Sequence, residues 1–291
     1  MTVLLPFLYL IIGMFLSRMG VDFKKQASTL LSKIVIPLVI IYNIFASEHD
    51  FFVIIVASFL IMAFMLQLAK RLTKDPVEEL CFCYLNIGWL ALPLAHAIFG
   101  NEPASVILAF YVGSSIQANL ASVTLFSSKL TWQSKVVKLL KAPHIWAILV
   151  GITLIPFKEP LMQMTLWPYI GMKFLMSALG MMILGAWLIN TKLNWDDVKR
   201  SFYFFWMRTL ALAFFITGLI LFSYWQSIDL ITRNIAVLYL LCFLPPAAYV
   251  VVLETQFLKT GKSAKIIASS TLISFVLLAL YIGALVYFEC I

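Results

Sequence analysis

The sequence predicts an all-α polytopic membrane protein with ten transmembrane helices, arranged as two inverted repeats of five. The first observation is composition, since 63% of the 291 residues are hydrophobic and only 12% are charged. A soluble domain carries about 25% charged residues, so this chain lacks the polar surface that a water-soluble fold needs. The second observation is the alternation of apolar runs with short basic loops, and the third is a proline interruption in the fourth run of each half.

The apolar runs have the length of membrane spans, since crossing the hydrocarbon core of a bilayer takes about 20 residues. The N-terminal run has no Lys or Arg before it and no small-residue cleavage site after it, so we expect a retained span rather than a secretion signal. No linker is long enough to hold a soluble domain. The predicted spans are Thr2–Ser17, Gln26–Ala46, Phe51–Leu68, Leu80–Phe99, Ala104–Ser127, Pro143–Phe157, Trp167–Ile189, Ser201–Trp225, Leu230–Phe257 and Ala264–Phe288.

Basic residues orient these spans. Lys and Arg gather in the loops after the odd-numbered spans, whereas the loops after spans 2 and 4 carry none. By the positive-inside rule the odd loops are cytoplasmic, and both termini lie on the non-cytoplasmic side of the cell inner (plasma) membrane. The net charge of +8 therefore reflects orientation and contact with anionic lipid headgroups, not nucleic-acid binding.

The two halves, residues 1–128 and 142–291, carry traces of a duplication. Five spans per half is an odd number, so the halves must have opposite orientations in the membrane. The span 2 segment LLSKIVIPLVIIYNIF aligns with IGMKFLMSALGMMILG of span 7, and Lys33 then meets Lys173.

The fourth span of each half contains helix breakers. Span 4 holds Asn86, Gly88 and Pro93, and span 9 holds Pro245 and Pro246. A proline inside a helix costs about 3 kcal/mol, and a break at membrane depth is tolerated only inside protein or along a wet cavity. Pro93 and Pro246 are expected to begin the second half-helices, where a missing N–H is no loss. If the spans cross at their breaks, two half-helix N-termini attract an anion and two C-termini attract a cation. Matched interruptions indicate a transporter binding site, whereas an ordinary kink is the alternative for either span alone.

Several short motifs occur in a fixed order along the chain. Span 4 reads N-x-G-aromatic-x-small-x-P and ends in AIFG. Span 9 carries P-P-A, span 10 carries SSTLIS, and spans 6 and 7 carry APHI and LGAWL. The residues that carry these elements include Pro37, Asn86, Gly88, Trp89, Ala91, Pro93, Pro143, Gly185, Pro245, Pro246, Ala247, Ser270, Thr271 and Ser274.

At these residues the sequence resembles the auxin efflux carrier family, the PIN-like transporters with their bacterial malate-permease-like members, over nearly the whole chain. It differs at Tyr249, where an Asn often follows the Pro pair, at Ala142, which replaces an Asn, and in lacking a long cytoplasmic loop. The resemblance implies a fold similar to the bile-acid/sodium symporters, with a scaffold of spans 1, 2, 6 and 7 and a mobile transport domain of spans 3–5 and 8–10. It also implies elevator-like movement, homodimers, and organic anions, typically carboxylates, as substrates.

Polar residues inside the membrane indicate a structural or functional role, because inserting an ionisable group there costs about 2.5–3.5 kcal/mol. Asn86, at the predicted crossover, either contacts substrate or holds the broken backbone. Gln117 and Asn119 lie two apart on different helix faces, so at most one points into a shared cavity, and interhelical hydrogen bonding is the favoured alternative. Lys33 either attracts the anion or extends its ammonium group to the interface. Lys173 is interpreted as snorkelling in the same way, and Arg208 as pairing with a headgroup or neighbouring carbonyls.

Two residues are candidates for coupling to a proton or sodium gradient. Glu254 is an acid inside the apolar pattern of span 9, and a water-exposed, snorkelling carboxylate is the favoured alternative. His96, three residues after Pro93, can titrate near neutral pH, against the alternative of a hydrogen-bonded structural histidine. Cys81 and Cys83 have no partners at zinc spacing, so we expect no metal site, and no cofactor.

These features favour a secondary active transporter of small organic anions. A sodium-coupled symporter of the bile-acid type is the second hypothesis, and sodium-dependent uptake would separate the two. A polytopic sensor without transport is the third. An enzyme is disfavoured, since the sequence has no H-E-x-x-H pair, no G-x-S-x-G elbow and no nucleotide-binding loop.

Overall fold

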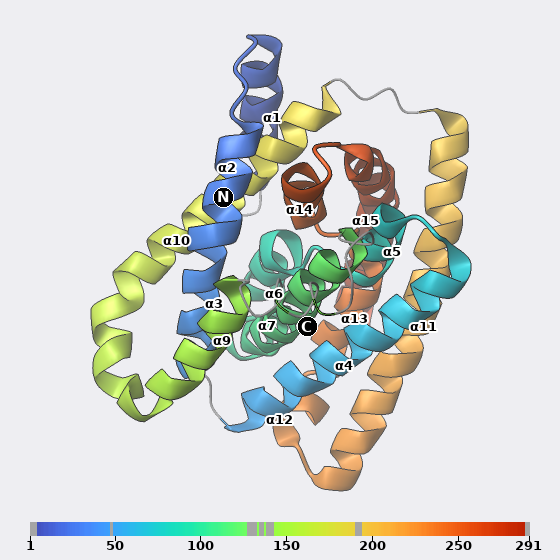
Figure 1. Cartoon of the computed structure of the whole chain (residues 1–291). Coiled ribbons are helices and arrows are strands. Elements are labelled where there is room, and N and C mark those ends of the chain that lie inside the picture. The colour runs from blue at the N-terminus through green and yellow to red at the C-terminus, as the bar shows by residue number, and fades with distance from the viewer. Residues whose placement is uncertain are drawn as a thin grey trace.

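The protein is described by a computed structural model that covers residues 5–46, 49–126, 133, 137, 143–189 and 194–288. Nearly all of this described chain is helical, and its one β feature is a single isolated bridge. Figure 1 shows the helices packed into one bundle. The elements of the first half are α1 (Leu5–Arg18), α2 (Lys24–Leu30), η1 (Leu31–Val35), α3 (Ile36–Phe45), α4 (His49–Leu72), α5 (Pro76–Cys83), η2 (Ile87–Ala91), α6 (Leu92–Phe99) and α7 (Asn101–Phe126).

The second half is built in the same way from long helices and one interrupted segment. Its C-terminal helix packs against the long helix that opens the last third of the chain. The elements are α9 (Pro143–Leu154), η3 (Ile155–Phe157), α10 (Lys158–Leu188), α11 (Trp195–Gln226), α12 (Asp229–Thr232), α13 (Ile235–Leu240), η4 (Leu241–Phe243), α14 (Tyr249–Phe257) and α15 (Lys262–Tyr287).

The described chain has six helical segments long and apolar enough to cross a membrane. Large apolar side chains such as Phe214 and Trp225 are exposed on their outer surface, which is the surface expected of helices in lipid. The chain is therefore a membrane-embedded, all-α protein. The six segments are Lys24–Phe45, Phe51–Leu72, Glu102–Phe126, Trp146–Leu188, Trp195–Gln226 and Lys262–Tyr287.

One predicted boundary is wrong. Span 7 was expected to start at Trp167, but α10 already begins at Lys158, and η3 joins it to α9 in a single apolar segment. The polar residues Lys158 and Glu159 occupy the first turn of α10. The backbone N–H groups of a first turn have no partner within the helix, so polar residues are common there. Pro168 lies inside the same helix, so this proline does not end it.

Two prolines are preceded by a wider helical turn. The π-helical turn η1 leads directly into α3, which has Pro37 in its first turn, and η2 leads into α6, which has Pro93 there. A proline has no N–H and its ring collides with the carbonyl one turn back. A π-helical turn changes that spacing, so both spans continue past their proline.

Glycines allow the closest helix contacts. Helices α1 and α10 pack along much of their length, and a Cβ at Gly13 or Gly185 would collide with the backbone of Met182 or Leu10. Small residues that let backbones approach are typical of helix interfaces in membranes. Gly113 brings α7 against α4 at Ile55 in the same way.

The helices contact one another mainly within two groups. In the first, α1, α2, η1 and α3 pack on α10, and α9 packs on α3, at the left of Figure 1. In the second, α4 packs on α7 and α5, α6 packs on α7, and α11 packs on α15. Contacts between the groups run chiefly from α2 and α10 to α14.

Because α1 and α10 are in close contact, we expect an added methyl group to lower stability at Gly185 but not at Gly171. Gly185→Ala should lower the melting temperature in detergent, because the added methyl group overlaps the Leu10 carbonyl and overpacking costs about 1–3 kcal/mol. The matched control is Gly171→Ala on the same helix, where a Cβ meets nothing within 4 Å and stability should not fall. Equal melting temperatures for the two variants would contradict this packing.

Candidate functional site

The two interrupted spans meet at their breaks. Leu85 and Pro246 form an antiparallel bridge, flanked by the Asn86 N–H donating to the Pro245 carbonyl at 2.9 Å and the Ala247 N–H donating to the Tyr84 carbonyl at 2.8 Å. The expectation that the breaks lie against each other is confirmed. We call residues 84–86 and 245–247 the break bridge.

The second half-helices begin differently from the expectation. Helical turns resume at Ile87, before Pro93, and α14 begins only at Tyr249. The expectation that Pro246 starts a half-helix is wrong, because pairing with Leu85 holds Pro246 in the bridge. The side chains of Trp89, Pro93 and His96 lie outside what the structure describes, so the proposed role of His96 stays a prediction.

Three successive carbonyls at the end of the first half of span 9 accept hydrogen bonds from side chains. The Cys242 carbonyl accepts from the Thr209 hydroxyl at 2.9 Å, the Phe243 carbonyl from the Ser274 hydroxyl at 2.5 Å, and the Leu244 carbonyl from the Arg208 guanidinium. The next carbonyl, that of Pro245, is held in the break bridge. The negative end of this half-helix is thus covered by three side-chain donors and one backbone donor.

A small pocket lies beside the break bridge. It has a volume of about 10 Å³, room for about one water molecule. Asn86 lies in its wall with only 9% of its surface exposed. The lining comes from both helix groups: Ile36, Tyr84, Leu85, Asn86, Gly88, Tyr111, Met176, Ala247 and Tyr249.

The structure brings some of the predicted binding residues together. Asn86 and Gly88 line the small pocket, and Pro245 and Pro246 belong to the break bridge. Lys33 has an exposed side chain on η1 and is not part of the lining. Its position fits an ammonium group that reaches the interface.

The polar residues of α7 reach the break only indirectly. Asn119 donates to the Ser115 carbonyl at 2.7 Å and accepts from the Tyr249 hydroxyl at 3.1 Å. Gln117 is buried, and its Oε1 has no hydrogen-bond partner within the described residues. Neither residue lines the small pocket, so Asn119 acts as an interhelical hydrogen-bonding group.

Glu254 is fully buried, at 0% exposure, so its interpretation as a water-exposed carboxylate is wrong. Its carboxylate accepts from the backbone N–H groups of Lys262 and Ser263 at 2.7 and 2.8 Å. The hydroxyls of Thr260 and Ser263 also donate to it. An anion at a helix N-terminus is stabilised by the helix dipole, which explains why the acid is tolerated there. These four bonds favour a capping role for Glu254 over ion coupling.

Sequence reasoning missed the tyrosines around the break. Tyr84 and Ser115 share a hydrogen bond of 3.1 Å, and the Tyr111 hydroxyl contacts the Met176 sulfur at 3.2 Å. A buried tyrosine hydroxyl normally finds a partner, so tyrosines inside apolar runs were the available signal. The rings of Tyr84 and Tyr111 form an aromatic part of the wall of the small pocket, and their hydroxyl groups are polar groups within it.

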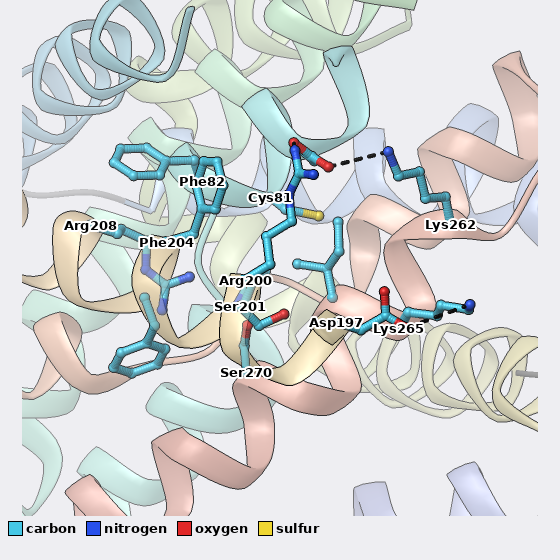
Figure 2. A pocket seen from close by; sticks show the side chains of 14 residues that line it. Cys81, Phe82, Asp197, Arg200, Ser201, Phe204, Arg208, Lys262, Lys265 and Ser270 are labelled. Carbon is cyan, nitrogen blue, oxygen red and sulfur yellow. Dashed lines mark hydrogen bonds and ion pairs between the residues drawn. The ribbon is translucent and has the colours of Figure 1, made fainter. Parts of the chain in front are cut away.

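A larger pocket of about 160 Å³ lies between α5, α11 and α15. Figure 2 shows its labelled side chains, which combine aromatic rings with charged groups. Pro246 of the break bridge contributes to its wall. The lining consists of Glu78, Cys81, Phe82, Asp197, Arg200, Ser201, Phe204, Phe205, Arg208, Pro246, Lys262, Lys265, Ile266 and Ser270.

Ion pairs surround the mouth of this pocket and tie three helices together. Glu78 of α5 accepts from Arg200 of α11 at 2.7 Å and from Lys262 of α15 at 3.2 Å. Lys262 also pairs with Asp75, and Lys265 lies 3.7 Å from Asp197. We call these six paired side chains the rim network.

Asp75 has two structural tasks. Its Oδ1 caps α5 by accepting from the Val77 and Glu78 N–H groups at 2.9 and 3.3 Å, and its Oδ2 pairs with Lys262. Burial alone would raise the pKa of the Asp75 carboxyl, but the Lys262 ammonium and the Val77 N–H together lower it below its usual value.

Comparisons with known proteins supply no identification, since no family model matches the chain and no curated protein matches it. The three free cysteines within the described residues, Cys81, Cys83 and Cys242, are all buried. The described residues contain no group of three or more His, Cys, Asp or Glu side chains placed to hold a metal ion. The break bridge and the two pockets are therefore the features on which a function can be argued.

The lowered pKa of Asp75 predicts a pH-dependent contribution to stability. The ionised carboxylate stabilises the fold above its unfolded pKa of about 3.9, and this contribution disappears as the pH falls through the lower folded pKa. Asp75→Asn keeps the helix cap and loses the ion pair, whereas Asp75→Ala loses both, with about 1 kcal/mol for the cap. Melting temperatures against pH should show a smaller acid-side drop for both variants and a lower neutral plateau for Asp75→Ala. An unchanged acid-side drop would contradict this role.

Proposed function

We propose that the chain is a secondary active transporter of small organic anions, in particular carboxylates, and that its substrate site lies at the break bridge. The observation that carries the proposal is the pairing of two interrupted helices at their breaks inside an apolar bundle. Irregular backbone at membrane depth is tolerated only where it is buried in protein or lines a water-filled cavity, and midplane sites of carriers are built from such half-helices. Membership of the auxin efflux carrier family, with ten spans in two inverted repeats, is part of the same proposal.

The arrangement of helix contacts supports alternating access. The small pocket is bounded on one side by Ile36 and Met176 of the α3–α10 group and on the other by the break bridge. A pocket at the contact between two groups changes its exposure when one group moves against the other. In this conformation it has room for about one water molecule, so substrate entry requires the groups to separate. We assign the α1–α3, α9 and α10 group as scaffold and the remaining helices as the mobile domain.

The charges at the break favour an anion over a cation as the transported ion. One of the two half-helix ends that could attract a cation, that of span 9, already has three carbonyls bonded to Thr209, Ser274 and Arg208. Asn86, by contrast, lies in the wall of the small pocket with a side-chain amide that can donate to a carboxylate. Sodium coupling is therefore the second candidate, and proton coupling or charge-driven flux the first.

Asn86 provides the direct test. Purified protein in proteoliposomes is assayed for uptake and efflux of radiolabelled carboxylates under imposed proton, sodium and voltage gradients. Asn86→Ala should reduce saturable flux about tenfold or more, because a hydrogen bond to a charged group contributes about 1.5–3 kcal/mol. The matched control is Asn234→Ala, a buried asparagine that bonds to Leu230 and Glu102 at the start of α13 and should keep its flux.

The outcomes separate the hypotheses. Flux that requires a sodium gradient would favour the bile-acid type of symporter, and flux unaffected by Asn86→Ala would move the substrate site away from the break. Absence of any anion flux by correctly folded protein would reject transport and favour a polytopic sensor.

A further inference from the structure

The pocket between α5, α11 and α15 is not explained by transport at the break bridge. Its lining residues lie on α5, α11, α15 and the break itself, which all belong to the helix group on one side of the small pocket. Movement between the two groups leaves these walls together. A molecule bound here would stay with its helices rather than be carried to another face by that movement.

Arg208 gives this pocket a buried, incompletely bonded cation. Only 2% of the residue is exposed, and its guanidinium lies 4.7 Å from the Phe205 ring centroid. Its hydrogen bond to the Leu244 carbonyl uses one of five N–H donors, and its Nε has no partner among the described residues. No acid of the described chain forms a salt bridge with it. Figure 2 shows this guanidinium among the lining side chains.

The charge balance identifies the kind of ligand that fits. Four cations line the pocket, and three of them, Arg200, Lys262 and Lys265, are paired within the rim network. The acids of that network, Glu78, Asp75 and Asp197, offset these three, so the charge of Arg208 remains uncompensated. One negative charge on a ligand would neutralise the site, whereas a dianion would add repulsion from Glu78 and Asp197.

The remaining walls are apolar and close to the charge. Phe82, Phe204, Phe205 and Ile266 line the pocket, so a ligand that fills it needs a hydrophobic body next to its anionic group. The volume of about 160 Å³ suits a body of a few carbon atoms, since an apolar cavity of about 150 Å³ binds benzene. The charged rim network indicates entry from water rather than from lipid.

We propose that this pocket is a second anion site, which binds a water-soluble monocarboxylate with a short apolar body through Arg208. Bound carboxylate adds hydrogen bonds to the guanidinium, which already connects α11 to the Leu244 carbonyl next to the break bridge. The site is independent of the substrate site at Asn86 and needs no transport to be detected.

Binding to the full-length protein tests the proposal. Wild type in nanodiscs of zwitterionic lipid is titrated by calorimetry with hexanoate, with inorganic phosphate, and in a separate arm with oleate in the bilayer. We expect saturable hexanoate binding that Arg208→Gln weakens about tenfold or more, the loss expected for a charge-assisted hydrogen bond. Lys199→Gln removes a positive charge from the same helix outside the pocket lining and should leave binding unchanged.

Two further variants keep the test decisive. If Arg208→Gln does not fold, Ser270→Leu fills the pocket while keeping the arginine, and should also abolish hexanoate binding. Asn86→Ala should retain this binding even where it abolishes flux, which separates failure here from failure of the proposed transport. The proposal is overturned if hexanoate does not bind, or if Asn86→Ala abolishes hexanoate binding while Arg208→Gln does not. It is also overturned if phosphate binds with the same affinity as hexanoate, or if oleate is the one ligand that binds.

Discussion

The pairing of two broken helices is the constraint on which the rest of the structure depends. Each break exposes backbone groups that have no partner within their own helix, and an unsatisfied group in a water-free interior costs several kcal/mol. The break bridge satisfies four of these groups with two hydrogen bonds. Because neither break is stable in lipid without the other, residues near 85 and near 246 must be brought together when the protein folds.

Helix ends also explain where two buried charges are found. Arg208 and Glu254 are nearly or fully inaccessible, and each faces a helix end of opposite polarity: a carbonyl at Leu244 for the arginine, and the N–H groups of Lys262 and Ser263 for the acid. The interruption of span 9 creates the end at Leu244, so the position of Arg208 follows from the break. The end that holds Glu254 is the first turn of α15, an ordinary helix start.

The all-α membrane class and the two interruptions could be predicted from the sequence, because apolar length and proline position act locally. The breaks at Asn86 and at Pro245 were visible as interruptions, and their contact follows from the need to satisfy them. The side chains that complete the site were not predictable in the same way. The importance of Tyr249 and Glu254 depends on partners 130 and 9 residues away, and the pocket around Arg208 depends on the packing of three helices. Glu254 shows the limit: its sequence position fits an exposed acid as well as a buried cap.

Two helices connect the rim network to the region of the break. The α5 helix begins in the rim network at Asp75 and ends in the break bridge at Tyr84. The α15 helix begins in the same network, where Lys262 meets Asp75 and Glu78, and further along its Ser274 holds the carbonyl of Phe243 just before the break. Two helices thus join the rim network to the break bridge, with Arg208 between them.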